Sequence, residues 1–372
     1  MTASPSPSAA PLLSVEDLTV TFTARGKRDI TAVSGVSFTV HRGEVAGLVG
    51  ESGCGKSVTS LALMGLLPRR GVRTGGRAVF RPDGGGDGTD LLALDDGRMR
   101  DLRGTRLAMV FQDPLSSLNP VVPIGVQVTE ILTRHRGLRG ARARTEAAHL
   151  LERVGIPDPT RRLKEYPHQL SGGMRQRALI AMAVACAPRL LIADEPTTAL
   201  DVTIQAQILE LLRELVDQEG TALLMITHDL GVVAGLCDRV NVLYAGKVVE
   251  AAERRPLFAA PAHPYTHGLL ASIPRLDAPR GLPLSPIRGS INDTIAWSDG
   301  CAFAPRCDHY SLACLEGTPE PAPAPSGPES HLVRCVHPVN TAPATAGQDP
   351  PLTPSDAPAP APATSATKEP AE

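Results

Sequence analysis

The chain has 372 residues, 42% of them hydrophobic, and a formal net charge of −2; this excludes a wholly disordered protein and gives no overall basic field that would indicate a nucleic-acid partner. At about 150 residues per domain, the length corresponds to about two and a half domains. No apolar run reaches the roughly 18 residues that span a bilayer, and residues 1–11 lack the basic and apolar regions of a signal peptide, so we expect the chain to stay in the cytosol.

The N-terminal part of the sequence predicts strands and then a helix. Residues 1–11 are small, polar and Pro-rich, and we expect them to be disordered. Alternation of apolar and polar residues over 18–22 and 36–40 predicts two half-buried strands. Residues 44–49 form a short apolar run that predicts a buried strand. A helix is predicted over residues 56–67, where a proline follows.

The middle of the chain alternates helices with buried strands. In chain order, the predicted elements are helical structure over about 114–177, a helix over 178–187, a strand at 190–193, an amphipathic helix over 204–215, and strands at 221–226 and 240–244. This alternation indicates an α/β domain with a largely parallel sheet. After about residue 256 Pro and Cys become frequent, and the Pro/Ala-rich tail at 339–372 is expected to be disordered.

A glycine-rich loop lies between the strand at 44–49 and the helix that follows. Its sequence, GESGCGKS, fits the phosphate-binding pattern G-x-x-x-x-G-K-[S/T] in the strand–loop–helix context that the pattern requires. Glycines let backbone N–H groups turn toward phosphate oxygens, and the helix N-terminus adds a partial positive charge. Lys56 is predicted to reach the β- and γ-phosphates and Ser57 to hold Mg²⁺, whereas Cys54 is interpreted as a small spacer. The residues predicted to bind ATP here are Gly50, Glu51, Ser52, Gly53, Cys54, Gly55, Lys56, Ser57 and Val58.

Two acidic residues follow the apolar run LLIA at the end of a predicted buried strand. Asp194 is expected to lie beside the phosphate-binding loop and bind Mg²⁺, directly or through water. Glu195 would then face the γ-phosphate and polarise the attacking water as a general base. Acids at strand ends are common, but the nearby phosphate-binding pattern makes a catalytic interpretation the stronger one.

The segment LSGGMRQR at residues 170–177 precedes that acid pair by about twenty residues. Here the sequence resembles the ATPase subunits of ABC transporters, whose signature is LSGGQ, with Met174 in place of the Gln. A Ser hydroxyl and Gly N–H groups at a helix start suit an anion. The resemblance implies that Ser171, Gly172 and Gly173 contact ATP held by an opposite subunit, in a head-to-tail dimer with two ATP sites.

Other positions match this family one by one. The resemblance implies that Gln112, in VFQDP, contacts Mg²⁺ and senses the transmembrane partner, and that Asp201, in TTALD, bridges the two ATP sites. It also implies that His228, in ITHD, hydrogen-bonds the γ-phosphate; outside this order of motifs His228 would be an ordinary residue at a strand end. We predict that Phe22 stacks on adenine, with a role in the strand core as the alternative.

The segment AHPYT at 262–266 and the LLASIP after it resemble the C-terminal extension of ATPases that drive oligopeptide, dipeptide and nickel importers. The resemblance covers roughly residues 12–338. It implies ATP hydrolysis coupled to peptide import at the cytoplasmic face of a bacterial cell membrane, where the chain is peripheral. The implied partners are a second ATPase subunit in a heterodimer, two transmembrane permeases and an extracytoplasmic substrate-binding protein.

Two alternatives to peptide import stay open. The cargo could be nickel or another small solute, because the ATPase does not touch the cargo. A soluble ABC ATPase of translation or DNA repair fits less well, since the chain has one cassette, no long coiled-coil insertion and a negative net charge.

Four cysteines cluster near the C-terminus with the spacing C-x5-C-x6-C-x20-C. Clustered thiols in a cytosolic protein are typical of metal sites. The resemblance implies a [4Fe–4S] cluster, while zinc and free buried thiols are the alternatives. The four are Cys301, Cys307, Cys314 and Cys335.

The predicted fold is therefore an α/β P-loop core of the ABC ATPase type with an N-terminal antiparallel β-layer. The nucleotide-binding domain is predicted over residues 12–258, with a helical subdomain inserted at about 113–178. A small Cys-containing domain is predicted over residues 259–338.

Overall fold

The structure, a computed structural model, describes residues 10–23, 26, 29–84, 86–198, 200–273, 287–290 and 300–339. The predicted disorder of residues 1–11 and 339–372 falls almost entirely outside these residues and stays a prediction. The strands are β1 (Leu13–Phe22), β2 (Ile30–Val40), β3 (Val45–Val49), β4 (Val72–Phe80), β5 (Thr89–Asp90), β6 (Leu107–Val110), β7 (Leu190–Asp194), β8 (Ala222–Thr227), β9 (Arg239–Tyr244), β10 (Lys247–Glu253), β11 (Ala322–Pro323) and β12 (Leu332–Val333). The α-helices are α1 (Lys56–Leu63), α2 (Asp96–Leu102), α3 (Pro114–Ser117), α4 (Ile124–Arg136), α5 (Gly140–Arg153), α6 (Pro159–Arg162), α7 (Gly172–Val184), α8 (Val202–Glu219), α9 (Leu230–Leu236), α10 (Arg254–Ala259) and α11 (Pro264–Ala271).

The main sheet has eight strands in the order β11-β12-β10-β9-β3-β8-β7-β6. Neighbouring strands from β9 to β6 run parallel, whereas β10 pairs antiparallel with β9. The strand VAGLV is buried along its whole length, as expected of a parallel strand that is covered on both faces. Because β3, β7 and β8 are parallel, their carboxyl ends meet at one edge of the sheet, where open α/β sheets bind ligands.

Alternation along β3 sends its side chains into two separate cores. Val45 and Val49 join a core shared with α4, α5, α7 and α8, whereas Ala46 and Leu48 join a core shared with β1, β2 and β4. The second core lies under a four-stranded antiparallel sheet of order β2-β1-β4-β5. Burial on both faces fixes the register of β3, because a slip by one residue would exchange the two sets of side chains.

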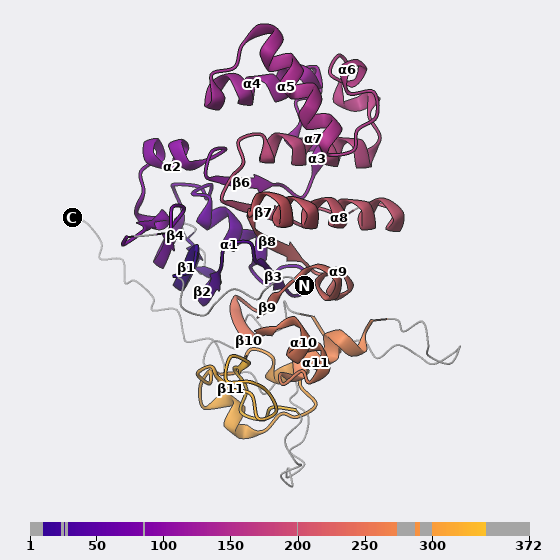
Figure 1. The fold of residues 1–372 in the computed structure, drawn as a ribbon. Coiled ribbons are helices and arrows are strands. Elements are labelled where there is room, and N and C mark those ends of the chain that lie inside the picture. The colour runs from indigo at the N-terminus through magenta and orange to yellow at the C-terminus, as the bar shows by residue number, and fades with distance from the viewer. Residues whose placement is uncertain are drawn as a thin grey trace, which may run out of the picture.

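The helices from α3 to α7 form a group that Figure 1 shows at the end of the molecule opposite the C-terminal segment. They fall in the region where the sequence predicts helical structure. The helix predicted over residues 56–67 is shorter than expected, because α1 ends at Leu63. Gly65 follows with φ 62° and donates its N–H to the carbonyl oxygen of Ala62, which closes the last turn of the helix.

The C-terminal segment is built into the main sheet. β12 pairs antiparallel with β10, with Val333 opposite Glu250, and β11 pairs with β12. Phe303 belongs to the larger core, and Cys301 and Cys307 pack against it. The prediction of a separate Cys-containing domain is therefore not confirmed, because the segment shares both a sheet and a core with the rest of the chain.

A buried carboxylate joins β10 to the C-terminal segment. Glu250 is 1% exposed, and its Oε1 accepts the Ala262 N–H at 2.7 Å and lies 2.7 Å from His331 Nε2. Its Oε2 accepts the His263 N–H at 2.9 Å. Burial alone would raise the pKa of Glu250, but the hydrogen bonds from His331 and the backbone hold it below its ordinary value. Ionised Glu250 therefore holds two parts of the C-terminal segment against the sheet.

His263 makes the stability of this attachment depend on pH. Its side chain caps α11 by accepting the Tyr265 N–H at 3.0 Å, and burial lowers the pKa of His263 from 6.5 to about 4. The folded state keeps the ring neutral, whereas the unfolded chain takes up a proton below pH 6.5. The contribution to stability is therefore complete above pH 6.5 and is lost as the pH falls toward 4.

We expect acidification from pH 7 to pH 5 to lower the free energy of unfolding by about 2 kcal/mol through His263 alone. His263→Asn should remove most of that difference, because the Asn side-chain oxygen can replace Nδ1 as the capping acceptor and does not titrate in this range. Urea denaturation at the two pH values measures the effect. His149→Asn, at an exposed position on α5, is the control and should keep the wild-type pH dependence. An unchanged pH dependence in His263→Asn would contradict the assignment.

Candidate functional site

The loop between β3 and α1 takes a shape that only glycine permits at its two ends. Gly50 has φ 153°, and a Cβ there would lie 2.2 Å from the Leu243 carbonyl oxygen. Gly55, the N-cap of α1, has φ 106°, and a Cβ would lie 2.5 Å from the Ala32 carbonyl oxygen. Glycines at these positions leave the backbone free to curve around an anion at the start of the helix.

Lys56 places a buried ammonium group inside this loop. Its side chain is 4% exposed, and Nζ donates to the carbonyl oxygens of Gly50 at 2.7 Å and Glu51 at 3.0 Å. Among the described residues no carboxylate lies within ion-pair distance of this Nζ. A buried cation that is satisfied by carbonyl oxygens and by the Cys54 sulfur, 3.9 Å away, suits an incoming phosphate, because the anion would supply the missing charge.

Ser57 and Asp194 bring oxygen atoms together next to the loop. Ser57, in the first turn of α1, donates from Oγ to Asp194 Oδ1 at 3.1 Å, and Ser60 donates to Oδ2 at 3.4 Å. Burial raises the pKa of Asp194, the hydrogen bond from Ser57 lowers it, and the charge of Glu195 raises it further. A hydroxyl and a carboxylate are the oxygen ligands that Mg²⁺ prefers, so these residues fit that ion.

The carboxylate of Glu195 contacts the side chains of three other residues. Its φ of 47° is rare for a residue other than glycine and turns the chain sharply after β7. Oε2 accepts hydrogen bonds from Gln112 Nε2 at 2.9 Å and Thr198 Oγ1 at 3.0 Å, while Oε1 lies 3.2 Å from His228 Nδ1. The structure thus brings together Gln112, Glu195 and His228, which the sequence analysis had selected separately. Thr198 was not predicted; its place three residues after Glu195 was the available signal.

The signature residues lie apart from this group. Ser171 caps α7 by accepting the Met174 N–H at 3.3 Å, and Ser171 and Gly172 are exposed. Asp201 is also exposed and caps α8 by accepting the Ile204 N–H at 3.0 Å. Within the described part of the chain no hydrogen bond links these residues to the glycine-rich loop. They are thus free to face another molecule.

Other residues predicted to contact the nucleotide lie in the core or in the exposed part of the loop. Phe22 ends β1, and Phe22 and Val58 pack partly buried against the core under the antiparallel sheet. Cys54 is buried, and burial raises the pKa of its thiol, as expected of a packing residue. Ser52 and Gly53 are exposed in the loop.

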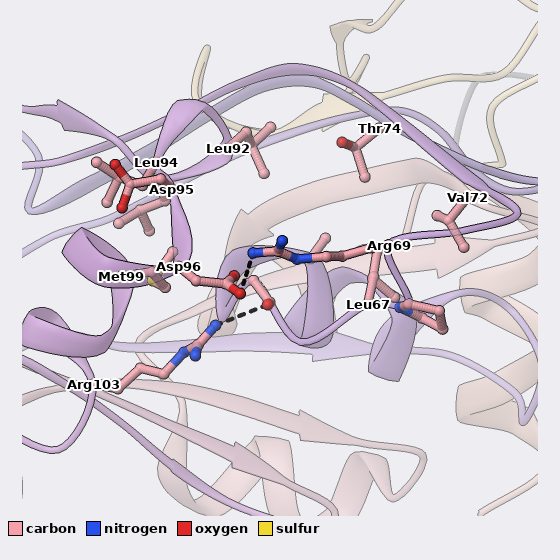
Figure 2. Close-up of a pocket in the computed structure, with 14 residues that line it drawn as sticks. Leu67, Arg69, Val72, Thr74, Leu92, Leu94, Asp95, Asp96, Met99 and Arg103 are labelled. Atoms are coloured by element: carbon pink, nitrogen blue, oxygen red, sulfur yellow. Dashed lines mark hydrogen bonds and ion pairs between the residues drawn. The ribbon is translucent and has the colours of Figure 1, made fainter.

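A cavity of about 360 Å³ lies beside α1 and α2, away from these residues (Figure 2). Arg69 forms an ion pair with Asp96 there, and Arg103 donates to the Gly65 carbonyl oxygen at 2.8 Å. None of the predicted nucleotide-binding residues lines it, so the cavity is distinct from the glycine-rich loop.

The models of two protein families match separate parts of the sequence. "ABC transporter" matches residues 33–198, and "Oligopeptide/dipeptide transporter, C-terminal region" matches residues 249–314. The chain is 50% identical over 325 residues to the dipeptide transport ATP-binding protein DppD of Bacillus subtilis, which covers 87% of this chain and 94% of that protein. It is 48% identical over 328 residues to the oligopeptide transport ATP-binding protein OppD of Salmonella typhimurium, which covers 88% of this chain and 94% of that protein.

The chain belongs to the ATP-binding proteins of ABC transporters. It is accordingly an ATPase that uses ATP and Mg²⁺. A solved structure of the ATP-binding cassette MJ0796, described as a dimer in a post-hydrolysis state with ADP and Pi, matches with a TM-score of 0.57 and 28% identity. The match covers 65% of this ABC ATPase and 99% of the cassette. The predicted family and the predicted ABC ATPase fold are both confirmed.

The prediction of an iron–sulfur cluster is wrong. Within the residues that the structure describes, no group of three or more His, Cys, Asp or Glu side chains is placed to hold a metal ion, which also overturns the zinc alternative. The relatives are described as ATP-binding transport proteins. Burial raises the pKa of Cys307 and of Cys335 to about 12. Cys301 packs with Cys307 on the larger core, and Cys314 is buried, so the four fit the alternative of free thiols. The four assigned to the cluster were Cys301, Cys307, Cys314 and Cys335.

Two further contacts with the glycine-rich loop were missed. Tyr265 and Arg306, both from the C-terminal segment, bind Glu51. Tyr265 lies in the AHPYT motif that indicated the transporter branch, but nothing in the sequence relates either residue to a loop more than two hundred positions away.

We expect Glu195→Gln to lower ATP hydrolysis by roughly 10²–10⁴, the usual effect of removing a positioned base. Binding of ATP should change little, because Gln keeps the size and shape of the side chain. Steady-state turnover and the dissociation constant of ATP measure the two effects. Glu210→Gln, at an exposed position on α8, is the matched control and should hydrolyse ATP at the wild-type rate. Retention of more than about a third of wild-type turnover in Glu195→Gln would remove it from the chemistry.

Proposed function

We propose that this ABC ATPase is the subunit that energises an importer of dipeptides or oligopeptides. One observation carries the proposal. Gln112 and His228 contact Glu195, and the nearby loop holds a buried Lys56 that has no carboxylate partner among the described residues. The match of residues 249–314 to the oligopeptide/dipeptide transporter C-terminal region supports the peptide cargo, as do the printed functions of the relatives.

Different residues of the site bind the phosphates of ATP, hold Mg²⁺ and act in hydrolysis. Backbone N–H groups of the loop, other than the Glu51 N–H that donates to Tyr265, and the Lys56 ammonium bind the phosphates of ATP, and Phe22 stacks on the adenine. Ser57, Asp194 and Gln112 hold Mg²⁺, which when bound neutralises charge on the phosphate oxygens. Glu195 accepts the proton of the attacking water, and His228 donates a hydrogen bond toward the γ-phosphate.

The signature residues act on a second ATPase subunit. Ser171, Gly172 and Asp201 are exposed residues at or next to helix starts, and among the described residues no hydrogen bond joins them to the glycine-rich loop of their own chain. In a head-to-tail dimer, Ser171, Gly172 and Gly173 contact the ATP of the partner subunit. Asp201 lies between the two sites. We propose a heterodimer with a different ATPase subunit.

The complex includes two transmembrane permeases and an extracytoplasmic binding protein for the peptide. None of the described helices is long and apolar enough to cross a membrane. We propose that the chain is a peripheral subunit on the cytoplasmic face of the cell membrane, as the printed functions of its transporter relatives suggest. Gln112 and the adjoining helices α3 to α6 transmit closure of the dimer to the permeases.

Peptide uptake by proteoliposomes tests the cargo. With the permeases, the binding protein and both ATPases present, we expect ATP-dependent uptake of a labelled tripeptide. Lys56→Ala should abolish hydrolysis and uptake together, because the loop loses its buried cation. Lys247→Ala, where the ammonium donates to Thr318 Oγ1 at 2.8 Å outside the site, is the control and should retain both. Uptake of Ni²⁺ in place of the peptide would contradict the cargo while leaving the ATPase role intact.

Turnover of the purified chain tests the heterodimer. Alone it should hydrolyse ATP slowly, because its exposed signature residues have no partner site to complete. Addition of the second ATPase subunit should raise turnover at least tenfold, and Ser171→Arg should abolish that gain without weakening ATP binding by the chain itself. A stable homodimer that supports full uptake without a second ATPase would contradict the proposal.

A further inference from the structure

The C-terminal segment reaches across the molecule to the phosphate-binding loop. Arg306 and Glu51 are 255 residues apart in sequence, yet their side chains form a bidentate ion pair. Arg306 Nη1 donates to Glu51 Oε2 at 2.7 Å, and Nη2 donates to Oε1 at 3.0 Å. This parallel arrangement is the strongest geometry available to a guanidinium and a carboxylate.

Arg306 is held in place by the rest of its surroundings. Its side chain is 3% exposed, against 32% for Glu51. Nε donates to the Arg288 carbonyl oxygen at 2.7 Å, Nη1 lies 3.3 Å from the Tyr244 hydroxyl, and the guanidinium stands 5.7 Å from the centre of the Tyr244 ring. A buried guanidinium needs such partners to offset the loss of water, so its position is well determined.

A second residue of the same segment binds the backbone of Glu51. The Glu51 N–H donates to the Tyr265 hydroxyl at 2.9 Å. Tyr265 is fully buried, and its ring packs 4.6 Å from the Tyr244 ring and 5.4 Å from the Phe303 ring. The C-terminal segment thus fixes both the main chain and the side chain of the second residue in the loop.

The charge of Glu51 is unfavourable in a loop that binds ATP. Its carbonyl oxygen accepts a hydrogen bond from Lys56 Nζ, so the residue lies beside the cation that meets the phosphates. A free carboxylate there would repel the phosphates and would draw on the positive potential of the helix start. Pairing with Arg306 cancels that charge at a site where a part-buried carboxylate is only weakly screened by solvent.

We propose that Arg306 and Tyr265 are positioning residues for the phosphate-binding loop, through which the C-terminal segment sets the affinity for ATP. The inference rests on the proposed ATP site and adds a control of that site from a segment outside the ATPase core. Arg306 acts by neutralising and orienting Glu51, and Tyr265 acts by holding the Glu51 main chain.

The test is the dissociation constant of MgATP, measured by titration of a fluorescent ATP analogue against the full chain. Arg306→Gln should weaken binding about tenfold, because the Glu51 carboxylate is left unpaired, while turnover at saturating ATP stays within about threefold. Arg306→Lys keeps the charge but cannot form the bidentate pair, so it should give an intermediate dissociation constant for MgATP. The double variant Glu51→Gln with Arg306→Gln should bind within about threefold of wild type, because the unpaired charge is removed with its partner.

The control is Arg334→Gln. Arg334 belongs to the same segment and donates to the Val248 and Pro319 carbonyl oxygens, but it does not reach the loop. Its loss should loosen the segment and leave the affinity for ATP unchanged. If Arg306→Gln fails to fold, Tyr265→Phe supplies the test, because it keeps the ring and removes the oxygen, with a predicted threefold loss of affinity.

The outcomes are distinct. Wild-type affinity in Arg306→Gln, or in Tyr265→Phe where that variant is used, overturns the inference. So does a double variant that binds as weakly as Arg306→Gln, or an equal loss in Arg334→Gln, because either result would mean that the segment acts only through general stability. A wild-type chain that binds no MgATP would instead overturn the proposed function.

Discussion

The buried ammonium of Lys56 is the constraint on which the rest of the site depends. Taking a charge out of water is costly unless it is compensated, and here the compensation is two carbonyl oxygens of the loop itself. Those carbonyls can turn inward only because the loop begins and ends on glycines whose Cβ atoms would collide with the backbone at Leu243 and Ala32. The loop is thus shaped in advance around a cation, and the remaining positive charge is available to an anion.

The order of the parallel strands then determines which side chains meet that loop. β8 lies between β3 and β7, so the loop after β3, the acids after β7 and His228 after β8 leave the same edge of the sheet. Asp194 bonds Ser57, and the next residue points its carboxylate at Gln112 and His228 because its backbone turns with φ 47°. A single backbone turn therefore directs two adjacent carboxylates to different partners, Asp194 to Ser57 and Glu195 to Gln112 and His228.

The sequence was most informative where chemistry and local pattern coincide. Three features could be predicted because each depends on a pattern of residues close together in the sequence. They are the glycine-rich loop, the acids after an apolar strand and the alternation of helices and strands. β4 was missed, since VRTGGRAVF carries two glycines and two arginines, and its strand state is imposed by pairing with β1. The cysteines were misjudged because their spacing in the sequence does not show whether the folded chain places the thiols to hold a metal ion; among the described residues no group is so placed. Arg306 and Tyr265 were missed because their partner is fixed only by the tertiary fold.

The C-terminal segment bears on the ATP site through one continuous set of contacts. The chain contains six Phe, four Tyr and one Trp, and three of these eleven rings, Tyr244, Tyr265 and Phe303, pack together behind the phosphate-binding loop. Tyr244 ends β9, the strand beside β3, whereas the other two rings belong to the C-terminal segment. Arg306 and Tyr265, which contact these rings or belong to them, are the residues of the segment that bind Glu51. The region that matches the oligopeptide/dipeptide transporter C-terminal description is therefore joined to the phosphate-binding loop by direct hydrogen bonds from the Arg306 side chain and to the Tyr265 hydroxyl.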